Sequence, residues 1–314
     1  MIETADLFGP AAPELRTVEE LLRNSVGEDP PEDSGPMGEL LSAGGKRIRP
    51  ALVLLTAMCG RYNRHPALAA AVAVEVVHAA TLVHDDVIDS APTRRGRPTV
   101  AAALGDEPAI VIGDYYFAKA YEWAARTQFP EAVSILAKAV MEICAGEVRQ
   151  QAIRYRYSTT IAEYMRRIEA KTAALVAASC DIGALLGGLD ASQRAALHAF
   201  GRALGLAFQI ADDVLDYTST EREVGKPIGH DIREGFATFP FMLASIHVDD
   251  QQRLTEDEAR NVVEEVRAHH GPERALEQAH EYVSAARAHL MALSPSDSVD
   301  ALSALADYVV SRKL

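Results

Sequence analysis

Apolar residues along this chain recur mainly at spacings of three and four, and strand-like alternation is almost absent. The clearest case is a one-sided apolar stripe near the C-terminus, made of Leu276, Ala279, Val283, Ala286, Leu290 and Leu293. Such a stripe is typical of an amphipathic helix that packs on a core. The pattern predicts an all-α protein of roughly a dozen helices.

Local signals mark where several helices begin. The stretch Thr255-Glu256-Asp257-Glu258 has the form of a capping box, and four prolines punctuate other helices: Pro130, Pro240, Pro272 and Pro295. A short N-terminal helix is expected around Pro13–Val26, followed by an exposed acidic linker rich in Pro and Gly from Glu28 to Gly38. No repeat of fixed period is found. We therefore predict one domain over residues 1–314, in which residues 1–40 hold this helix and linker.

Composition narrows the class of protein. The 314 residues are 48% hydrophobic, enough for a large core, and the net charge is −14, which argues against nucleic-acid binding because phosphate polymers would be repelled. The cysteines Cys59, Cys144 and Cys180 lie far apart and fit reduced thiols. No signal peptide is recognised at the N-terminus, and Glu75 and His78 interrupt the most apolar stretch. We expect a cytoplasmic protein without a transmembrane segment.

The most informative motif occurs twice. The segments Asp85-Asp86-Val87-Ile88-Asp89 and Asp212-Asp213-Val214-Leu215-Asp216 both read D-D-x-x-D within apolar, helical stretches. Because residues i and i+4 share a helix face, each motif gathers three carboxylates in a narrow arc. Repulsion among them is relieved by cations, and clustered oxygen ligands suit Mg²⁺ bridging to substrate phosphates. The alternative is a solvated acidic face, which the apolar neighbours Val83, Val87 and Ile88 disfavour.

Basic and polar residues lie near both motifs. His78 precedes Asp85 by two turns on the same face, although a lone helical histidine is often only structural. The loop Thr93-Arg94-Arg95-Gly96-Arg97 could form surface ion pairs or bind a diphosphate. The loop Gly44-Gly45-Lys46-Arg47-Ile48-Arg49 precedes a helix and is a second candidate phosphate site, but lacks the Walker A pattern.

Polar residues also occur around the second motif. Lys171 and Thr172 lie in an Ala-rich stretch that predicts a buried helix, where Lys171 either has a partner or reaches the surface. Gln209 precedes Asp212 by three residues, and Lys226 lies in an irregular segment after the motif. The sequence alone thus favours a helical enzyme that handles diphosphates through Mg²⁺.

Taken together, these residues resemble the trans-isoprenyl diphosphate synthase (polyprenyl synthetase) family. The likeness extends from about Gly44 to Pro240 and includes, in family order, GGKRIRP, EVVHAATLVHDDVIDSAPTRRGRPT, GD at Gly113-Asp114, KTAAL, FQIADDVLDY and GKPIGHDIREG. The resemblance implies a helical bundle around a central cavity and a homodimer. It also implies head-to-tail 1'-4 condensation of isopentenyl diphosphate with an allylic diphosphate (dimethylallyl, geranyl, farnesyl or geranylgeranyl), with three Mg²⁺ ions per site.

The resemblance also assigns roles to residues. It implies that Asp85, Asp89 and Asp212 bind Mg²⁺ directly, and that Asp86, Asp213 and Asp216 support them. The residues implied to hold the allylic diphosphate are Arg94, Lys171 and Lys226. Those implied to hold isopentenyl diphosphate are Lys46, Arg49, His78 and Arg95. Thr172 and Gln209 are expected to place oxygen dipoles near the developing allylic cation.

Two features bear on activity and product. Many family members read D-x-x-x-G-K-x-T where this chain has Asp231 to Thr238, so Phe236 replaces a lysine. In the family, bulk just before the first motif blocks chain growth. Here the expected tunnel residues are the small or medium Val77, Ala80 and Thr81, with Phe117 on the next helix as a possible floor. We expect a product of C20 or longer.

Two other classes of protein compete with this interpretation. A class I terpene cyclase shares the first motif but carries an N-S-E or D-T-E type second metal motif, which Asp212-Asp213-Val214-Leu215-Asp216 does not match. A non-catalytic partner subunit usually loses aspartates, and all six are present here.

Overall fold

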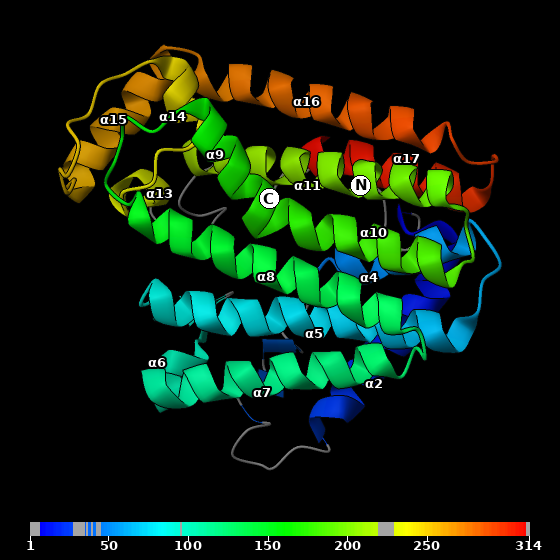
Figure 1. Cartoon of the computed structure of the whole chain (residues 1–314). Coiled ribbons are helices and arrows are strands. Elements are labelled where there is room, and N and C mark those ends of the chain that lie inside the picture. Colours follow the sequence, from blue (N-terminus) through cyan, green and yellow to red (C-terminus); the bar gives the residue numbers. More distant parts are fainter. Residues whose placement is uncertain are drawn as a thin grey trace. The chain divides into compact units, whose positions relative to one another are not determined.

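The computed structural model describes residues 7–27, 35, 37–38, 40–41, 45–94, 96–218 and 229–311. These residues are almost entirely helical (Figure 1), which confirms the predicted all-α class. The chain forms two compact units, the first comprising residues 1–140, 178–197 and 292–302, and the second comprising the remainder. Helices α8, α10, α11 and α17 contribute residues to both units, and the single domain stays a prediction.

The first unit is built around one long apolar helix. Its own elements are η1 (Gly9–Ala11), α2 (Ala12–Gly27), α4 (Ile48–Met58), α5 (Arg64–Ile88), β1 (Thr93–Arg94), β2 (Arg97–Pro98), α6 (Val100–Leu104) and α7 (Asp106–Ala125). Helix α5 is buried nearly all round, as expected for a helix that is apolar on every face. It is the one described helix long and apolar enough to cross a membrane, but 83% of its apolar window is buried inside the protein. Helices α5 and α7 run side by side (Figure 1).

The second unit contains the other elements. They are α9 (Ile161–Ile168), η2 (Glu169–Ala173), α13 (His230–Arg233), α14 (Phe239–Ala244), α15 (Glu256–Ala268) and α16 (Gly271–Leu290), while the shared helices are α8 (Pro130–Ala152), α10 (Ala174–Leu186), α11 (Ala191–Thr218) and α17 (Asp297–Ser311). The predicted capping box begins α15, and α16 carries the predicted apolar stripe as far as Leu290, whereas Leu293 lies beyond the end of the helix. Pro130, Pro240 and Pro272 all fall in the first turn of a helix, where the missing N–H is tolerated.

Two sequence expectations need correction. The loop that carries Arg94 is a short antiparallel hairpin, in which Arg94 pairs with Arg97 around Gly96; Gly96 has a φ of +76°, which glycine adopts readily. The segment from Glu28 to Gly38 was expected to be an exposed linker, yet Met37 within it is fully buried. Met37 is a single apolar residue in a segment rich in Gly, Pro and acidic residues. It therefore gives no periodic signal from which its burial could be predicted. Residues 28–34 and 36 lie outside the described residues.

A π-helical turn interrupts the helices of the second unit. Element η2 joins α9 to α10 and contains Lys171 and Thr172. Two glycines let neighbouring helices approach it closely. A Cβ atom at Gly146 of α8 would lie 2.9 Å from Ala170 Cβ, and one at Gly205 of α11 would lie 2.5 Å from Ala173 Cα. Single π turns occur frequently at functional sites.

This packing predicts the effect of Gly205→Ala. The added methyl group meets backbone atoms of η2, so we expect a loss of about 1–3 kcal/mol in the free energy of unfolding, as for an overpacked core. Urea denaturation measures the loss. Gly35→Ala is the control, because a Cβ atom at Gly35 meets nothing within 4 Å. Equal stability of the two variants would contradict the close approach of α11 to η2.

Candidate active site

The first aspartate motif closes helix α5. Asp85 and Asp86 lie in its last turn and Asp89 is its C-cap residue. The C-terminus of a helix carries partial negative charge, which disfavours carboxylates and favours cations. Asp85 is half-buried, Asp89 is exposed, and Asp86 is only 2% exposed. Repulsion among these groups and with the helix end makes the last turn of α5 a place where a cation is stabilised.

Arg94 holds the buried member of this motif. Its Nε donates to Asp86 Oδ1 at 2.8 Å, and its Nη2 lies 2.7 Å from the same oxygen. The hairpin therefore folds its arginine back onto the end of α5. Since Asp86 Oδ1 is engaged by a guanidinium, Asp86 is poorly suited to bind a metal directly.

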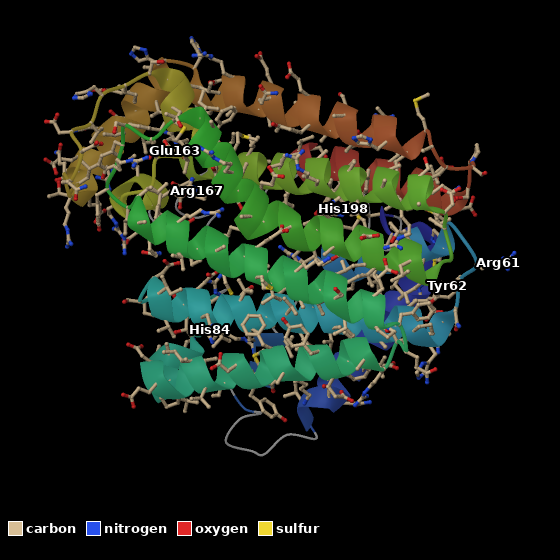
Figure 2. The ribbon with its side chains drawn as sticks, in the orientation of Figure 1. Arg61, Tyr62, His84, Glu163, Arg167 and His198 are labelled. Atoms are coloured by element: carbon tan, nitrogen blue, oxygen red, sulfur yellow. The ribbon has the colours of Figure 1, made fainter. Side chains whose placement is uncertain are left out.

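His84 was missed by sequence reasoning. It precedes the motif and lies against α7 (Figure 2), with its Nε2 3.0 Å from the Ile110 carbonyl oxygen and its ring centroid 5.5 Å from that of Phe117. A Cβ atom at Gly113 would lie 2.2 Å from His84 Nε2. The GD pair at Gly113-Asp114 could have given a hint, because a glycine within a helix often marks a close approach.

The residues expected to bind isopentenyl diphosphate fall on two elements of the first unit. Lys46 is exposed just before α4, Arg49 is half-buried in its first turn, and His78 is half-buried on α5. Arg95 lies outside the described residues. Between Lys46 and Arg49, Arg47 is buried and bonded to Glu19 and Glu75, an arrangement that the sequence did not reveal.

The second aspartate motif spans the last two turns of α11 and belongs to a hydrogen-bonded network. Tyr164 Oη donates to Asp213 Oδ2 at 2.7 Å, and Gln209 Nε2 donates to Asp213 Oδ1 at 2.9 Å. Thr172 Oγ1 in turn donates to Gln209 Oε1 at 2.6 Å. Thr172 and Gln209, which were predicted together, are thus hydrogen-bonded to each other, and Gln209 links both to the second motif. Tyr164 was not predicted, because an isolated tyrosine carries no motif.

Asp216 is engaged by the loop that follows the motif. Its two carboxylate oxygens accept the backbone N–H groups of His230 and Asp231 at 3.2 and 3.1 Å. Burial, and next the nearby carboxylate of Asp231, raise the pKa of both Asp213 and Asp216 to about 7. A bound divalent cation would reverse this effect by favouring the charged forms. Asp212 is half-buried on the same turns.

Lys171 has a partner. Its Nζ lies 2.6 Å from Glu147 Oε2 on α8, and its side chain is partly exposed. The sequence left two alternatives for Lys171, a paired ammonium and a surface lysine. The structure combines them, because the ammonium is paired at a partly exposed position. Lys226 lies outside the described residues.

Phe236, which stands in place of the usual lysine, lies close to two arginines. The guanidinium carbons of Arg154 and Arg167 are 5.5 and 5.9 Å from its ring centroid. Arg167 is buried on α9 (Figure 2) and donates to the Ala237 carbonyl oxygen. Its charge lowers the pKa of Asp213, but burial of Asp213 raises that pKa by more. Positive charge therefore remains around Phe236 although the lysine is missing.

The donor set fits Mg²⁺. Both motifs supply hard carboxylate oxygens at partly buried helix ends, and this ion usually binds through one or two carboxylates plus phosphate and water. Within the described residues, no group of three or more His, Cys, Asp or Glu side chains is arranged to hold a metal by itself. An ion bound at either motif would take further ligands from phosphate or water.

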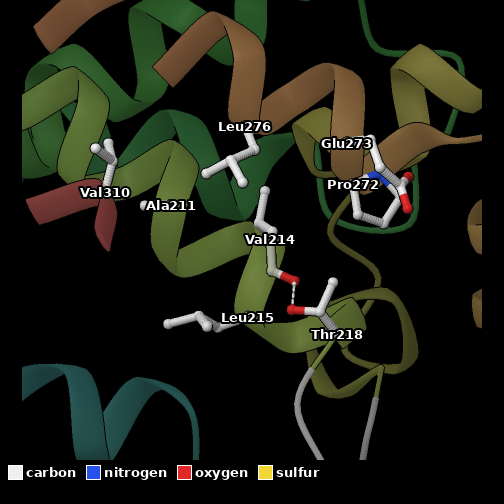
Figure 3. A pocket seen from close by; sticks show the side chains of 8 residues that line it. All are labelled: Ala211, Val214, Leu215, Thr218, Pro272, Glu273, Leu276 and Val310. Carbon is white, nitrogen blue, oxygen red and sulfur yellow. Dashed lines mark hydrogen bonds between the residues drawn. The ribbon is translucent and has the colours of Figure 1, made fainter. Parts of the chain in front are cut away.

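A separate apolar pocket lies on the other side of α11. It has a volume of about 340 Å³ and is lined by Ala211, Val214, Leu215, Thr218, Pro272, Glu273, Leu276 and Val310 (Figure 3). At about 100° per residue, the lining positions of α11 point away from Asp212, Asp213 and Asp216. With one carboxylate and no basic residue among its lining residues, this pocket does not suit a diphosphate.

The expected tunnel residues are on α5 and α7. Val77 and Ala80 are fully buried, Thr81 is half-buried and donates to the His78 carbonyl oxygen at 2.7 Å, and Phe117 contacts His84. All four belong to the first unit, and their role in product length stays a prediction.

Comparisons with known proteins identify the family of this chain. The polyprenyl synthetase family model matches residues 32–271. Heptaprenyl diphosphate synthase component 2 of Bacillus subtilis is 38% identical over 96% of this chain and 88% of its own, and that of Geobacillus stearothermophilus is 46% identical over 74% and 72%. A polyprenyl synthase of Caulobacter crescentus, solved with calcium and isoprenyl diphosphate, has a TM-score of 0.90 and is 34% identical over 97% of this chain and 96% of its own.

The chain therefore belongs to the polyprenyl synthetase family. It is a prenyltransferase of the prenyl diphosphate synthase type.

The raised pKa of Asp213 predicts a pH effect on stability. In metal-free buffer the folded state holds a proton on Asp213 up to about pH 7, whereas an unfolded aspartate loses it near pH 4. The contribution of Asp213 to stability therefore falls as the pH rises from about 4 through 7. As the pH rises from 5 to 8, the free energy of unfolding of Asp213→Asn should therefore increase by about 1–3 kcal/mol relative to that of wild type.

Urea denaturation in EDTA at the two pH values measures this gain. Asp257→Asn is the control for the substitution itself, because its side chain on α15 is 92% exposed. A constant difference between Asp213→Asn and wild type would contradict the buried, protonated state.

Proposed function

We propose that this chain catalyses the Mg²⁺-dependent 1'-4 condensation of isopentenyl diphosphate with an allylic diphosphate, giving a linear all-trans polyprenyl diphosphate of C20 or longer. The observation that carries the proposal is the state of the two D-D-x-x-D motifs. All six carboxylates are present near helix ends, their exposure ranges from buried to exposed, and in each motif a buried aspartate is anchored by other side chains of the protein. The Caulobacter relative was solved with calcium and isoprenyl diphosphate, which supports this use of the motifs.

The proposed chemistry assigns a task to each group. Asp85, Asp89 and Asp212 would bind the metal ions, while Asp86, Asp213 and Asp216 keep their contacts with Arg94, Tyr164 and the loop amides. Mg²⁺ supplies Lewis-acid stabilisation of the leaving diphosphate. Arg94 and Lys171, with Lys226, add charge where negative charge grows as the allylic C–O bond breaks.

The remaining groups act on the carbon side of the reaction. The hydroxyl of Thr172 and the amide oxygen of Gln209 already share a hydrogen bond, and their dipoles would stabilise the allylic cation. Isopentenyl diphosphate would be held by Lys46, Arg49, His78 and Arg95 so that its double bond attacks that cation. Holding both substrates in this geometry lowers the entropic part of the barrier. Loss of a proton then gives the new allylic double bond, with the departed pyrophosphate as base.

For assembly we favour a homodimer. Helix α7 exposes Ile110, Val111 and Tyr115, and Val111 is 67% exposed, so an apolar partner surface would cover this face. A second candidate is association with a different subunit, since two relatives are named component 2 of a heptaprenyl diphosphate synthase. We also expect a cytoplasmic location.

The condensation is tested with the purified chain alone. Incubation with Mg²⁺, isopentenyl diphosphate and each of four allylic primers should give linear prenols after phosphatase treatment, read by mass spectrometry. EDTA should abolish product, and Asp85→Asn or Asp212→Asn should lower kcat by about 100-fold or more because transition-state charge is no longer neutralised. Asp257→Asn is the matched control and should keep wild-type rates.

The other outcomes of this assay are informative. Cyclised hydrocarbons would indicate a terpene cyclase. No product from any primer would contradict a self-sufficient enzyme and favour the subunit interpretation, which product formation after addition of a second subunit would identify.

Product length is tested with Ala80→Phe. If Ala80 lines the tunnel, the ring blocks it and the main product shortens by at least one five-carbon unit. Ala103→Phe, which adds the same ring at an exposed position of α6, should leave the product unchanged. Unchanged product length in a folded Ala80→Phe variant would contradict the tunnel, and loss of its folded structure would instead place Ala80 in packed core.

A further inference from the structure

Arg47 lies in an unusual conformation beside the predicted site for isopentenyl diphosphate. It is the N-cap residue of α4, with φ 48° and ψ 35°, and is only 8% exposed. The left-handed region is uncommon for a residue with a side chain, so the surroundings must hold it there. The exposed Lys46 precedes Arg47 directly, and Arg49 follows in the first turn of α4.

The Arg47 guanidinium joins three parts of the first unit. Its Nε lies 2.5 Å from Glu19 Oε1 on α2, its Nη1 lies 2.6 Å from Glu75 Oε1 on α5, and its Nη2 donates to the Leu41 carbonyl oxygen at 2.5 Å. Glu75 is itself only 6% exposed. A lysine could not make these contacts in three directions, because only the planar guanidinium fork presents donors at fixed angles.

The charges show that Arg47 is not itself a phosphate ligand. One guanidinium faces two carboxylates, so this cluster has a net charge of −1 and no positive charge left for an anion. Its position suggests a different task. Glu75 lies three residues before His78, one turn away on α5, so the Arg47–Glu75 pair ties the loop of Lys46 and Arg49 to the helix that carries His78.

We infer that Arg47 and Glu75 form a positioning pair that sets Lys46 and Arg49 at the correct distance from His78 to bind the diphosphate of isopentenyl diphosphate. The inference rests on the proposed function and assigns two residues to it that the sequence motifs did not. A buried ion pair is often no better for stability than apolar residues of the same size. A role in placing the basic loop gives this pair a purpose beyond stability.

The test uses two conservative variants and one matched control. Glu75→Gln keeps the shape of the side chain and removes its charge, and Arg47→Lys keeps the charge and removes the fork. Arg64→Ala is the control, because Arg64 also bridges α5 and α2, through Glu14 and Thr17, but is exposed and lies at the start of α5, about three turns before Glu75. Titration calorimetry with isopentenyl diphosphate alone, without an allylic primer, measures binding in the absence of turnover.

We expect both variants to bind isopentenyl diphosphate about tenfold or more weakly, since misplacement by about 1 Å is costly. Their KM for the allylic substrate should stay near that of wild type, and Arg64→Ala should match wild type in both. Unchanged binding of isopentenyl diphosphate would overturn the inference. An equal loss of affinity for both substrates would also overturn it, whether or not the variants have unfolded. If wild-type protein binds isopentenyl diphosphate and the variants do not, yet no elongation occurs, the proposed condensation fails while the positioning role stands.

Discussion

The constraint on which this structure depends is the repulsion among carboxylates at the negative ends of two long helices. Asp85, Asp86 and Asp89 end α5, and Asp212, Asp213 and Asp216 lie near the end of α11. A helix end without such charges would be more stable. The protein keeps this arrangement at both places, and neighbouring groups are arranged to hold the carboxylates.

The spacing within each motif explains why its aspartates differ in burial and in bonding partners. The first and fifth residues of D-D-x-x-D lie within about 40° of each other around the helix, whereas the second is rotated by about 100° from the first. In both motifs the second aspartate is the buried one, only 2% exposed at Asp86 and 3% at Asp213. Each is bonded to other side chains, Asp86 to Arg94 and Asp213 to Tyr164 and Gln209. One aspartate per motif therefore anchors the cluster and the others face more open surroundings.

The sequence predicted those parts of the fold that follow from periodicity and local chemistry. The N-terminal helix, the capping box before α15 and the apolar stripe of α16 are confirmed because each depends on neighbouring residues alone. The family likeness named Thr172 and Gln209 together, and the structure joins them by a hydrogen bond. The roles of the site residues in catalysis stay predictions, and Arg95 and Lys226 lie outside the described residues.

The features that were missed depend on contacts between distant segments. The π turn at η2 needs Gly146 and Gly205 from two other helices. The inward turn of Arg47 depends on Glu19 and Glu75, each 28 residues away in sequence. At Phe236 the usual lysine is missing, yet Arg154 and Arg167 from other elements lie within 6 Å of its ring centroid. No local pattern contains this information.

The proposed function requires both carboxylate clusters to act on the metal ions of a single diphosphate. A double-mutant cycle of Asp85→Asn and Asp212→Asn, with kcat/KM measured across a range of Mg²⁺ concentrations, tests it most directly. If both clusters serve one transition state, the double variant should lose far less than the product of the two single losses, with a coupling energy of about 1 kcal/mol or more. Losses that simply multiply at every Mg²⁺ concentration would contradict the claim.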